Sequence, residues 1–376
     1  MSATVFERLL GASGASQDLT RRYADDARIF PSRLARVALA ALFAVMIAAP
    51  FALDDFWTSV LIMGGITSIG AIGLNLLSGY TGQVSLGHAF FLGTGAYSAA
   101  WLTARFDLPF PLWLIGAGVI GGFIGGVAGP FALRLRGNYL VIVSLALVVL
   151  GQHVFENWTS VTGGLTGVSV RARVSFLGLD FARLSIPGLD APLSRNHGFF
   201  YLIWGTVAVL ALLAKNIVRT RPGRAMQAIR DRDVAAEVIG VSLVKYKVGA
   251  FVVSSAYAAV AGALYAAYAR YVSPLDFGLP LSIQYIAMIV VGGMATIHGS
   301  ILGALFLTAV PRLVEMLAPA LSLATGPASG GGITIATVNQ MIFGALIIAF
   351  LLFEPRGLSG IWLRLKLYFK AWPFSY

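Results

Sequence analysis

Polar side chains interrupt several long uncharged stretches of this sequence, and their chemistry is the first thing to explain. The stretch GYTGQVSLGHAFFLGTGAYS at 79–98 carries Gln83, Ser85 and His88 within an otherwise apolar run. An unpaired polar group in hydrocarbon is costly, so such residues face protein, water or a ligand. They can line a path for a small solute or hydrogen-bond neighbouring helices, and both roles stay open. The candidate path residues are Asn75, Gln83, Ser85, His88, Asn138, Tyr139, Gln284, Tyr285, Thr296 and His298, with Ser144, Asn339 and Gln340 of the same kind.

Catalytic chemistry is not indicated by these residues. The chain has no cysteine, and its four histidines are scattered without metal-ligand spacing. His88 and His298 each lie beside a glycine at the start of an apolar run, but no Asp or Glu accompanies them as a proton relay would require. We therefore expect no catalytic residue, no metal site and no cofactor bound by this chain, which is not an enzyme.

Glycines accompany the polar residues and predict two kinds of backbone. Gly79, Gly82, Gly292 and Gly293 fit bent or unwound chain, which survives at membrane depth only where protein or a water-filled cavity covers it. A second set fits close helix packing, and it consists of Gly87, Gly93, Gly95, Gly299 and Gly303. The likeness of SLGHAFFLGTGA to IHGSILGALF hints at an internal repeat, which transporters often contain.

The elements that must position these residues are membrane-spanning helices. The chain has 376 residues, of which 58% are hydrophobic and only 11% charged, whereas soluble domains average about 25% charged. This composition predicts an all-α polytopic membrane protein of about ten segments, some of them broken or re-entrant. The expected spans are 37–53, 56–78, 83–104, 111–133, 139–158, 198–218, 248–268, a short piece near 281–293, 297–316 and 334–353.

Positive charges indicate the orientation of these spans. Cations gather at 1–36, at Arg134 and Arg136, at 215–247 and at 356–370, and cytoplasmic loops carry such an excess. Both termini are then cytoplasmic: a tail at 1–36 and a tail at 354–376 flank a transmembrane domain at 37–353. The loop 159–197 falls outside, although its arginines run against the rule. Because the cations lie between apolar runs rather than on a stripe with aromatics, nucleic-acid binding is not expected.

The segment 219–247 stands out among the cytoplasmic loops. Residues 223–240 show apolar positions at helical spacing between Pro222 and Gly240, and they predict one short amphipathic helix. Such a helix can lie on the membrane surface or dock into a groove of a soluble partner, and the residues alone favour neither. The candidate docking residues are Arg224, Met226, Ile229, Arg230, Arg232, Asp233, Glu237 and Gly240.

A resemblance adds to this reading. Residues 223–266, GRAMQAIRDRDVAAEVIGVSLVKYKVGAFVVSSAYAAVAGALYA, resemble the Liv-type permeases, the membrane subunits of branched-chain amino acid ATP-binding cassette importers. Other pieces match in order: GLNLLSGYTGQVSLGHAFFLGTGAYSAA at 73–100, LRLRGNYLVIVSLAL at 133–147, VGGMATIHGSILGALF at 291–306 and FEPRGLSG at 353–360. The first 35 residues and the 159–197 loop are not covered.

The resemblance implies a permease of the bacterial plasma membrane without ATPase activity of its own. Its partners would be a second homologous permease, two cytoplasmic ATPase subunits that bind ATP and Mg, and an extracytoplasmic solute-binding protein. The chain has no G-x-x-x-x-G-K-[ST] loop, so phosphate chemistry must lie on the partners. The resemblance also favours ATPase docking by 223–240. A urea or short-amide importer of the same class and an ion-coupled secondary transporter remain as alternatives.

Overall fold

The computed structural model describes residues 44–133, 139–176, 179–181, 194–317, 335–354 and 356–371. Contacts divide the chain into a unit that ends at Thr58 and a unit that begins at Ser59. The first unit contains a helical turn region at 44–52 and the start of the next helix. Asn138, the expected tail at 1–36 and the last residues, 372–376, of the expected tail at 354–376 lie outside the described residues.

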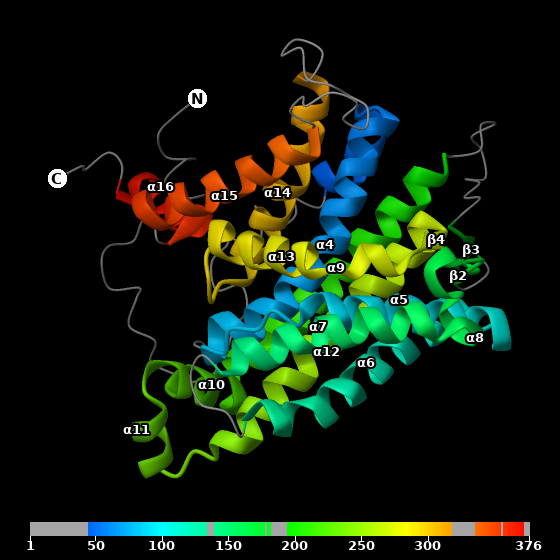
Figure 1. The fold of residues 1–376 in the computed structure, drawn as a ribbon. Coiled ribbons are helices and arrows are strands. Elements are labelled where there is room, and N and C mark those ends of the chain that lie inside the picture. The colour runs from blue at the N-terminus through cyan, green and yellow to red at the C-terminus, as the bar shows by residue number, and fades with distance from the viewer. Residues whose placement is uncertain are drawn as a thin grey trace, which may run out of the picture. The chain divides into compact units, whose positions relative to one another are not determined.

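Long helices make up most of the second unit, and they are labelled in Figure 1. The first half of the chain contains α4 (Asp55–Thr81), α5 (His88–Phe106), α6 (Phe110–Leu133), α7 (Tyr139–Asn157), α8 (Thr159–Thr162), η1 (Gly164–Thr166), β1 (Val168–Ser169), β2 (Ser175–Phe176) and β3 (Leu179–Asp180). The second half contains α9 (Arg195–Arg219), α10 (Arg221–Asp231), α11 (Asp233–Val238), α12 (Leu243–Ala269), β4 (Tyr271–Val272), η2 (Pro274–Phe277), α13 (Leu279–Gly292), α14 (Ile297–Leu317), α15 (Ile335–Phe353) and α16 (Gly357–Ala371).

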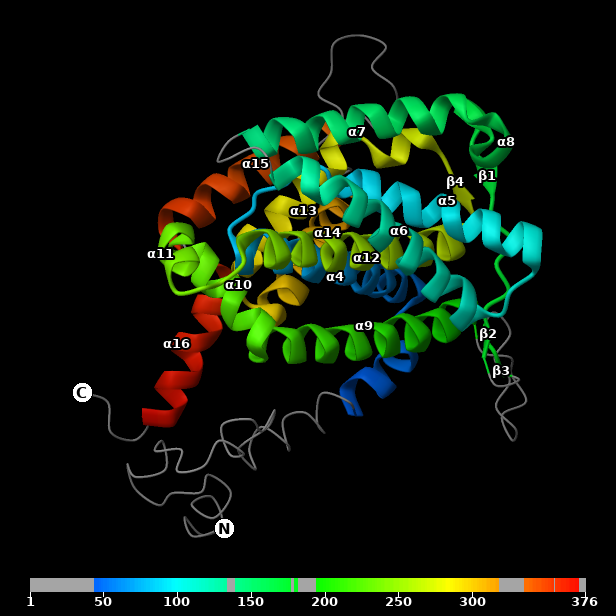
Figure 2. The same ribbon diagram turned by 90° about the horizontal axis from the view of Figure 1, so that it is seen from below.

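Helix α12 packs closely against both α5 and α6, and this trio forms the tightest part of the core (Figure 2). Small residues permit the contact: a Cβ on Gly95 would lie 2.0 Å from the Ala259 carbonyl oxygen, and one on Gly262 would lie 1.9 Å from that of Leu92. Close backbone approach through small residues is the usual way in which membrane helices associate, because the hydrophobic effect adds little there. The glycines therefore fix the positions of α5 and α12.

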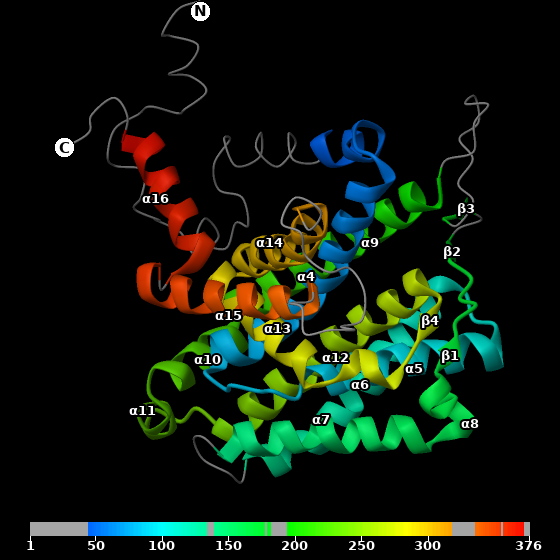
Figure 3. The ribbon, with the colours of Figure 1, turned by 45° about the horizontal axis from the view of Figure 1, so that its top comes forward.

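The number of membrane crossings is established only in part. Among the described residues, five helices are long and apolar enough to cross a bilayer, namely α4, α6, α9, α12 and α14. Two bent pairs raise the number to seven: α7 with residues 159–166, and α15 with α16, which meet at 47° (Figure 3). The expected division of 277–316 into two helices is confirmed by α13 and α14. The all-α polytopic class is confirmed, whereas about ten spans stays a prediction.

Two groups of short elements lie at opposite ends of helices α5, α7 and α12. Figure 2 shows α10 and α11 at one end, and α8, β1 and β4 at the other. Strand β1 pairs antiparallel with β4, with Val168 opposite Val272, and β2 pairs with β3. The expected single helix at 223–240 is wrong: α10 and α11 are separate because Arg232 between them has extended backbone.

Candidate functional site

A break between α4 and α5, at residues 82–87, contains most of the first polar motif. Gly82 ends the turn with φ of +72°, a backbone conformation that other residues adopt at a cost. The Ser78 hydroxyl donates to the Gln83 carbonyl at 3.0 Å, and the Gln83 amide nitrogen Nε2 donates to Thr81 Oγ1 at 3.2 Å. The Ser78 side chain therefore satisfies a backbone carbonyl that has left the helix, as non-helical chain within a membrane requires.

Hydroxyl groups from three segments accept backbone N–H groups at and just before the start of α5. The N–H of Leu86 donates to Ser144 of α7 at 2.9 Å, and that of Ala89 donates to Ser282 of α13 at 3.0 Å. Within the break, the N–H of Gly87 donates to Ser85 at 3.2 Å. The first N–H groups of a helix lack partners inside the helix, so Ser282 caps α5 at Ala89, whereas Ser144 and Ser85 satisfy N–H groups just before the helix. Ser85 and Ser144 were expected as possible path residues, and the structure gives them these backbone contacts.

His88, the first residue of α5, contacts Tyr285 of α13. Their ring centroids are 5.0 Å apart with the planes tilted by 59°, and both side chains are buried. Among the described residues, His88 Nε2 and Gln83 Oε1 are buried polar atoms for which no hydrogen-bond partner is found. Because leaving such atoms unpaired is costly, they are the groups of this region most available to a solute or to water.

The second break, between α13 and α14, is held by one side chain of α4. The Asn75 Nδ2 group donates to the Thr296 carbonyl at 2.9 Å and to the Ser300 hydroxyl at 2.6 Å. Its Oδ1 accepts the N–H of Ala295 at 2.9 Å. Asn75 thus has donors and acceptor all engaged within the protein. Asn75 and Thr296 were expected as path residues, but their contacts are those of an interhelical clamp.

Two of the four glycines expected in bent backbone are instead helical. Gly79 lies within α4, where a Cβ would sit 2.6 Å from the N–H nitrogen of Ala295, so its small size makes room for the clamp. Gly292 ends α13, and a Cβ there would lie 2.0 Å from the Gly299 carbonyl oxygen. The prediction was wrong at these two positions because glycine serves close packing as well as turns. Gly293 has φ of +114° and so joins Gly82 as bent backbone.

The glycines expected in packing all lie against neighbouring backbone or rings. Gly93 faces the ring of Phe155, and Gly87 faces the backbone of Ser144. A Cβ on Gly303 would lie 2.0 Å from the Met288 carbonyl oxygen, which brings α14 against α13. The start of α16 covers the same place, because a Cβ on Gly293 would lie 2.1 Å from Ser359 Oγ. The motifs at 73–100, 291–306 and 353–360 therefore meet around the second break.

The remaining predicted path residues do not join this cluster. Gln284 is half-buried on α13 and His298 is exposed at the start of α14. The backbone of Tyr139 starts α7, but its side chain and that of Asn339 lie outside what the structure describes. Gln340 is exposed on α15. Ser282 and Ser300 were missed by sequence reasoning, because a single serine in an apolar helix gives no signal of its partner.

The α10–α11 segment has an inner and an outer face. Met226 and Ile229 of α10 are 4% and 3% exposed, since they pack on this chain's own helices α9 and α12. Both were expected among the docking residues, and this part of the prediction is wrong for contact with a partner. The exposed apolar residues are those of α11 and its end, where Val234, Val238 and Ile239 are 70%, 82% and 75% exposed.

Exposed charged residues occur in the same segment as this apolar group. Arg224, Arg230, Arg232, Asp233 and Glu237 are all exposed, and Gly240, with φ of +86°, ends the segment. An apolar centre with a charged rim is the usual composition of a protein interface.

Helix α10 lies next to the first break. A Cβ added at Gly82 would lie 3.5 Å from Cγ and 3.6 Å from Cα of Arg230, so Arg230 is the side chain that borders this turn. The turn at Gly82 is followed at once by Gln83 and, at the start of α5, by His88. Helix α10 is therefore a neighbour of the backbone that positions the unpartnered polar atoms.

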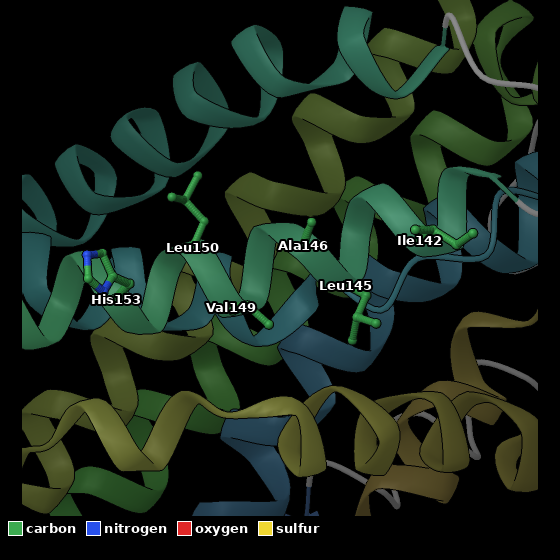
Figure 4. Close-up of a pocket in the computed structure, with 6 residues that line it drawn as sticks. All are labelled: Ile142, Leu145, Ala146, Val149, Leu150 and His153. Atoms are coloured by element: carbon green, nitrogen blue, oxygen red, sulfur yellow. The ribbon is translucent and has the colours of Figure 1, made fainter.

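A groove of about 610 Å³ runs along α7, and Figure 4 shows its six lining side chains. All belong to α7, and five of them are aliphatic: Ile142, Leu145, Ala146, Val149, Leu150 and His153. With one imidazole and no charged group, this groove has the composition of a surface facing lipid or another membrane helix rather than a polar solute.

Comparison with known proteins identifies similar sequences. The family model described as branched-chain amino acid transport system / permease component matches residues 56–352. The chain is 30% identical over 334 residues to the high-affinity branched-chain amino acid transport system permease protein LivM of Escherichia coli, covering 86% of this chain and 74% of that protein. It is 25% identical over 308 residues to LivH, a permease protein of the same kind of system in Salmonella typhimurium, covering 79% and 92%. The autoinducer 2 import system permease protein LsrC of Escherichia coli O157:H7 is 28% identical over 184 residues, covering 47% and 48%. No solved structure matches the chain.

Proposed function

This chain belongs to the family of branched-chain amino acid transport system permease components, and from that premise we propose that it is the membrane subunit of an ATP-driven importer for branched-chain or related amino acids. It is a multi-pass membrane protein and a transport permease rather than an enzyme. The proposed location is the bacterial plasma membrane, with α10 and α11 on the cytoplasmic side, where the positive charges of 215–247 favour them.

The observation that carries the proposal is the exposed apolar group of α11. Val234, Val238 and Ile239 project from a segment that is otherwise charged, and apolar side chains exposed in this way mark protein contacts. We assign this group to docking with a cytoplasmic ATPase subunit. The charges of the same segment, including Arg232 and Glu237, would fix the register and orientation of the partner.

Helix α10 provides the route from the ATPase to the membrane region. Its buried face, with Met226 and Ile229, packs on the chain's own helices, so α10 moves with them rather than independently. Its position beside Gly82 then joins the docked partner to the break before α5. ATP-driven closure of two ATPase subunits would alter this break and switch the access of the path from one side to the other.

The proposed solute path passes the unpartnered groups of the first break. Gln83 Oε1 and His88 Nε2 offer neutral hydrogen-bonding atoms beside the Tyr285 ring, which suits a solute with an apolar side chain and no net charge. Specificity would then come largely from an extracytoplasmic solute-binding protein. A second homologous permease is supported by the similarity of this chain to both LivM and LivH.

A neutral solute such as urea or a short amide remains the second candidate for the same class of importer. The observation in its favour is that the atoms available in the path carry no charge to pair with an ammonium or carboxylate group. The similarity to LsrC, whose printed function is autoinducer 2 import, illustrates that related permeases serve other solutes.

The test is co-purification followed by uptake. A tagged form of this chain should bring down ATPase subunits and a second permease, and vesicles containing the complex should accumulate leucine only with ATP and the binding protein. Uptake of urea or acetamide instead would select the second candidate. Uptake that follows an ion gradient without any ATPase subunit would contradict the proposal and support a secondary transporter.

A further inference from the structure

Helices α7 and α12 have their C-terminal ends far from α10 and α11 (Figure 2). Large apolar side chains are exposed in the segments that follow these ends. Leu165 of η1 and Leu275 of η2 are 69% and 72% exposed, and Trp158 and Tyr271 are also exposed. We call residues 158–171 together with 270–277 the outer platform. It includes TSVTGGLTGVS at 159–169, whose role the path and the docking segment leave unexplained.

The outer platform is a built structure and not a loose loop. Strands β1 and β4 pair, and the N–H of Val170 donates to the Arg270 carbonyl at 2.8 Å. The Tyr271 hydroxyl donates to the Thr166 carbonyl. Gly167 has φ of +70°, and a Cβ there would lie 2.4 Å from the Val272 carbonyl oxygen. The two halves are thus held in one arrangement, which lowers the entropy cost of binding a partner.

The backbone conformation of the outer platform shows that the platform does not lie in the hydrocarbon core of the bilayer. Strands of two residues and a short 3₁₀ helix leave backbone N–H and C=O groups unpaired at their edges, and lipid-exposed chain of this kind does not occur in hydrocarbon. Leu165 and Leu275 therefore lie outside the hydrocarbon core, and neighbouring exposed apolar groups in such a position mark an interaction site.

Positive charge lies beside the apolar residues. Arg171 and Arg270 are exposed, whereas Arg173 is paired with Asp107 at 2.9 Å. Asp276 is also exposed and its carboxylate accepts the N–H of Ser273 at 3.0 Å as part of a helix cap, so these two exposed arginines outnumber this one carboxylate. The outer platform therefore fits a partner with an apolar contact region bordered by carboxylates.

We propose that the outer platform is the docking surface for the extracytoplasmic solute-binding protein, with Leu165 and Leu275 as its apolar contacts and Arg171 and Arg270 as partners of acidic side chains. This inference rests on the proposed importer function. It adds the surface on which the partner binds and the chemistry that the partner must present.

Ring contacts connect the outer platform to α5, the helix that begins at the proposed solute path. Helix η2 exposes Leu275 outward while Phe277 is buried and contacts the rings of Tyr97 at 6.1 Å and Phe155 at 6.4 Å. Tyr97 lies on α5, and its hydroxyl is one of the buried polar groups for which no partner is found among the described residues. A protein bound at Leu275 therefore acts on the aromatic cluster that packs against α5.

The absence of cysteine from the sequence makes a direct test possible. Leu165→Cys and Leu275→Cys, each labelled with a photoreactive maleimide in the assembled importer, should cross-link to solute-binding protein added on the outside. Val119→Cys, exposed on α6, and Val238→Cys, exposed on α11, are controls that should give no such adduct. The inference would be overturned by adducts with lipid alone or with the second permease alone. It would also be overturned if a complex that still transports leucine gave no adduct.

Charge and size substitutions give an independent measurement. Leu275→Glu and Arg270→Glu should weaken stimulation of ATP hydrolysis by the binding protein about tenfold or more, while ATPase subunits still co-purify. Leu275→Ala guards against misfolding by Leu275→Glu and should show a smaller loss of the same kind. Unchanged stimulation in all three variants would contradict the docking surface. Loss of ATPase subunits from the unaltered chain would instead contradict the proposed function.

Discussion

The buried polar side chains of this chain divide into two kinds according to their partners. Asn75 has its amide donors and acceptor engaged by the second break, and Ser85 accepts the backbone N–H of Gly87 just before α5. His88 Nε2 and Gln83 Oε1 lack partners among the described residues. The sequence places all four in the same class, because a polar residue in an apolar run looks alike whether its partner is another helix or a solute. Only the arrangement of the helices separates a clamp from a path residue.

Substitution of His88 should impair transport without loss of assembly. Because its Nε2 is available in the proposed path, His88→Ala should lower the rate of leucine uptake by about tenfold, the equivalent of about 1.4 kcal/mol in the transition state. His298→Ala is the matched control, since His298 also follows a break but is exposed. Uptake by proteoliposomes containing equal amounts of complex measures both. Equal uptake by the two variants would remove His88 from the path.

Substitution of Asn75 should impair stability. Asn75→Ala removes three hydrogen bonds and leaves polar groups of residues 295–300 without these partners. We therefore expect a loss of about 1–3 kcal/mol in the free energy of unfolding. Gln340→Ala, at an exposed position on α15, should change little. Unfolding in detergent by a graded denaturant provides the comparison, and an Asn75→Ala protein as stable as the control would show that the clamp contributes nothing.

At the scale of elements, the two breaks use different means to leave the helix. The first ends α4 at a left-handed glycine, and serines from its own break, α7 and α13 accept N–H groups at and just before the start of α5. The second break bends at Gly293, with φ of +114°, and is held by the Asn75 side chain of α4. Their glycine signals predicted a bend at Gly82 and Gly293 correctly and at Gly79 and Gly292 wrongly. The difference depends on neighbouring backbone, which the sequence does not contain.

The turn at Gly82 gives a prediction about coupling. Gly82→Ala places a Cβ in left-handed backbone, at a cost of about 1–2 kcal/mol, and adds an atom against Arg230. ATP hydrolysis should then continue while leucine uptake per ATP falls. Gly249→Ala on α12 is the control, since no other atom lies within 4 Å of its Cβ position. A ratio of uptake to hydrolysis that is the same in both variants would contradict the coupling route.

The docking segment gives a second prediction at this scale. Val238 is 82% exposed, so Val238→Glu should not disturb folding but should place an uncompensated charge in the proposed ATPase contact. We expect ATPase association to weaken by about tenfold or more. Leu165→Glu, at a position of the outer platform that is 69% exposed, should leave ATPase association intact. Quantitative pull-down of ATPase subunits distinguishes the two, and retention by Val238→Glu would exclude α11 as the contact.

Sequence periodicity located the docking segment but not its outer face. The apolar spacing of 223–240 was read as one stripe, yet Met226 and Ile229 face α9 and α12 whereas Val234 and Val238 face outward. Both sets satisfy the same helical spacing. A hydrophobic pattern predicts that a helix face is buried, but it does not identify whether this chain or a partner buries it. The interruption at Arg232 has no composition signal, since arginine is an ordinary helix residue.

For the whole molecule, the charge pattern predicts which regions share a side of the membrane. Accessibility of single cysteines to a labelling reagent tests this prediction. Val238, Trp362 and Leu275 are suitable positions, because each is exposed and the chain has no other cysteine. Val238→Cys and Trp362→Cys should react with a membrane-impermeant maleimide only in inverted vesicles, and Leu275→Cys only in intact cells. Labelling of Trp362→Cys from outside would require an odd number of crossings between α11 and α16 and would contradict cytoplasmic placement of the C-terminal tail.

Sequence reasoning was least able to predict contacts between distant segments. The pairing of β1 with β4 involves two residues from each strand, too short for an alternating pattern to be recognised. The meeting of the motifs at 73–100, 291–306 and 353–360 likewise depends on helix packing. Long apolar helices and their glycines could be predicted from composition, whereas the outer platform could not.

The Asn75 clamp also imposes an order on biogenesis. Asn75 enters the membrane with α4, but the Thr296 carbonyl that it binds is 221 residues further along the chain. At a synthesis rate of about 5–20 residues per second, roughly 10–40 s pass before that partner is made. During this interval the amide must stay near water, the insertion machinery or a substitute partner, because leaving it unsatisfied in lipid costs several kcal/mol. The first described transmembrane helix therefore reaches its final environment only after the later helices have been inserted.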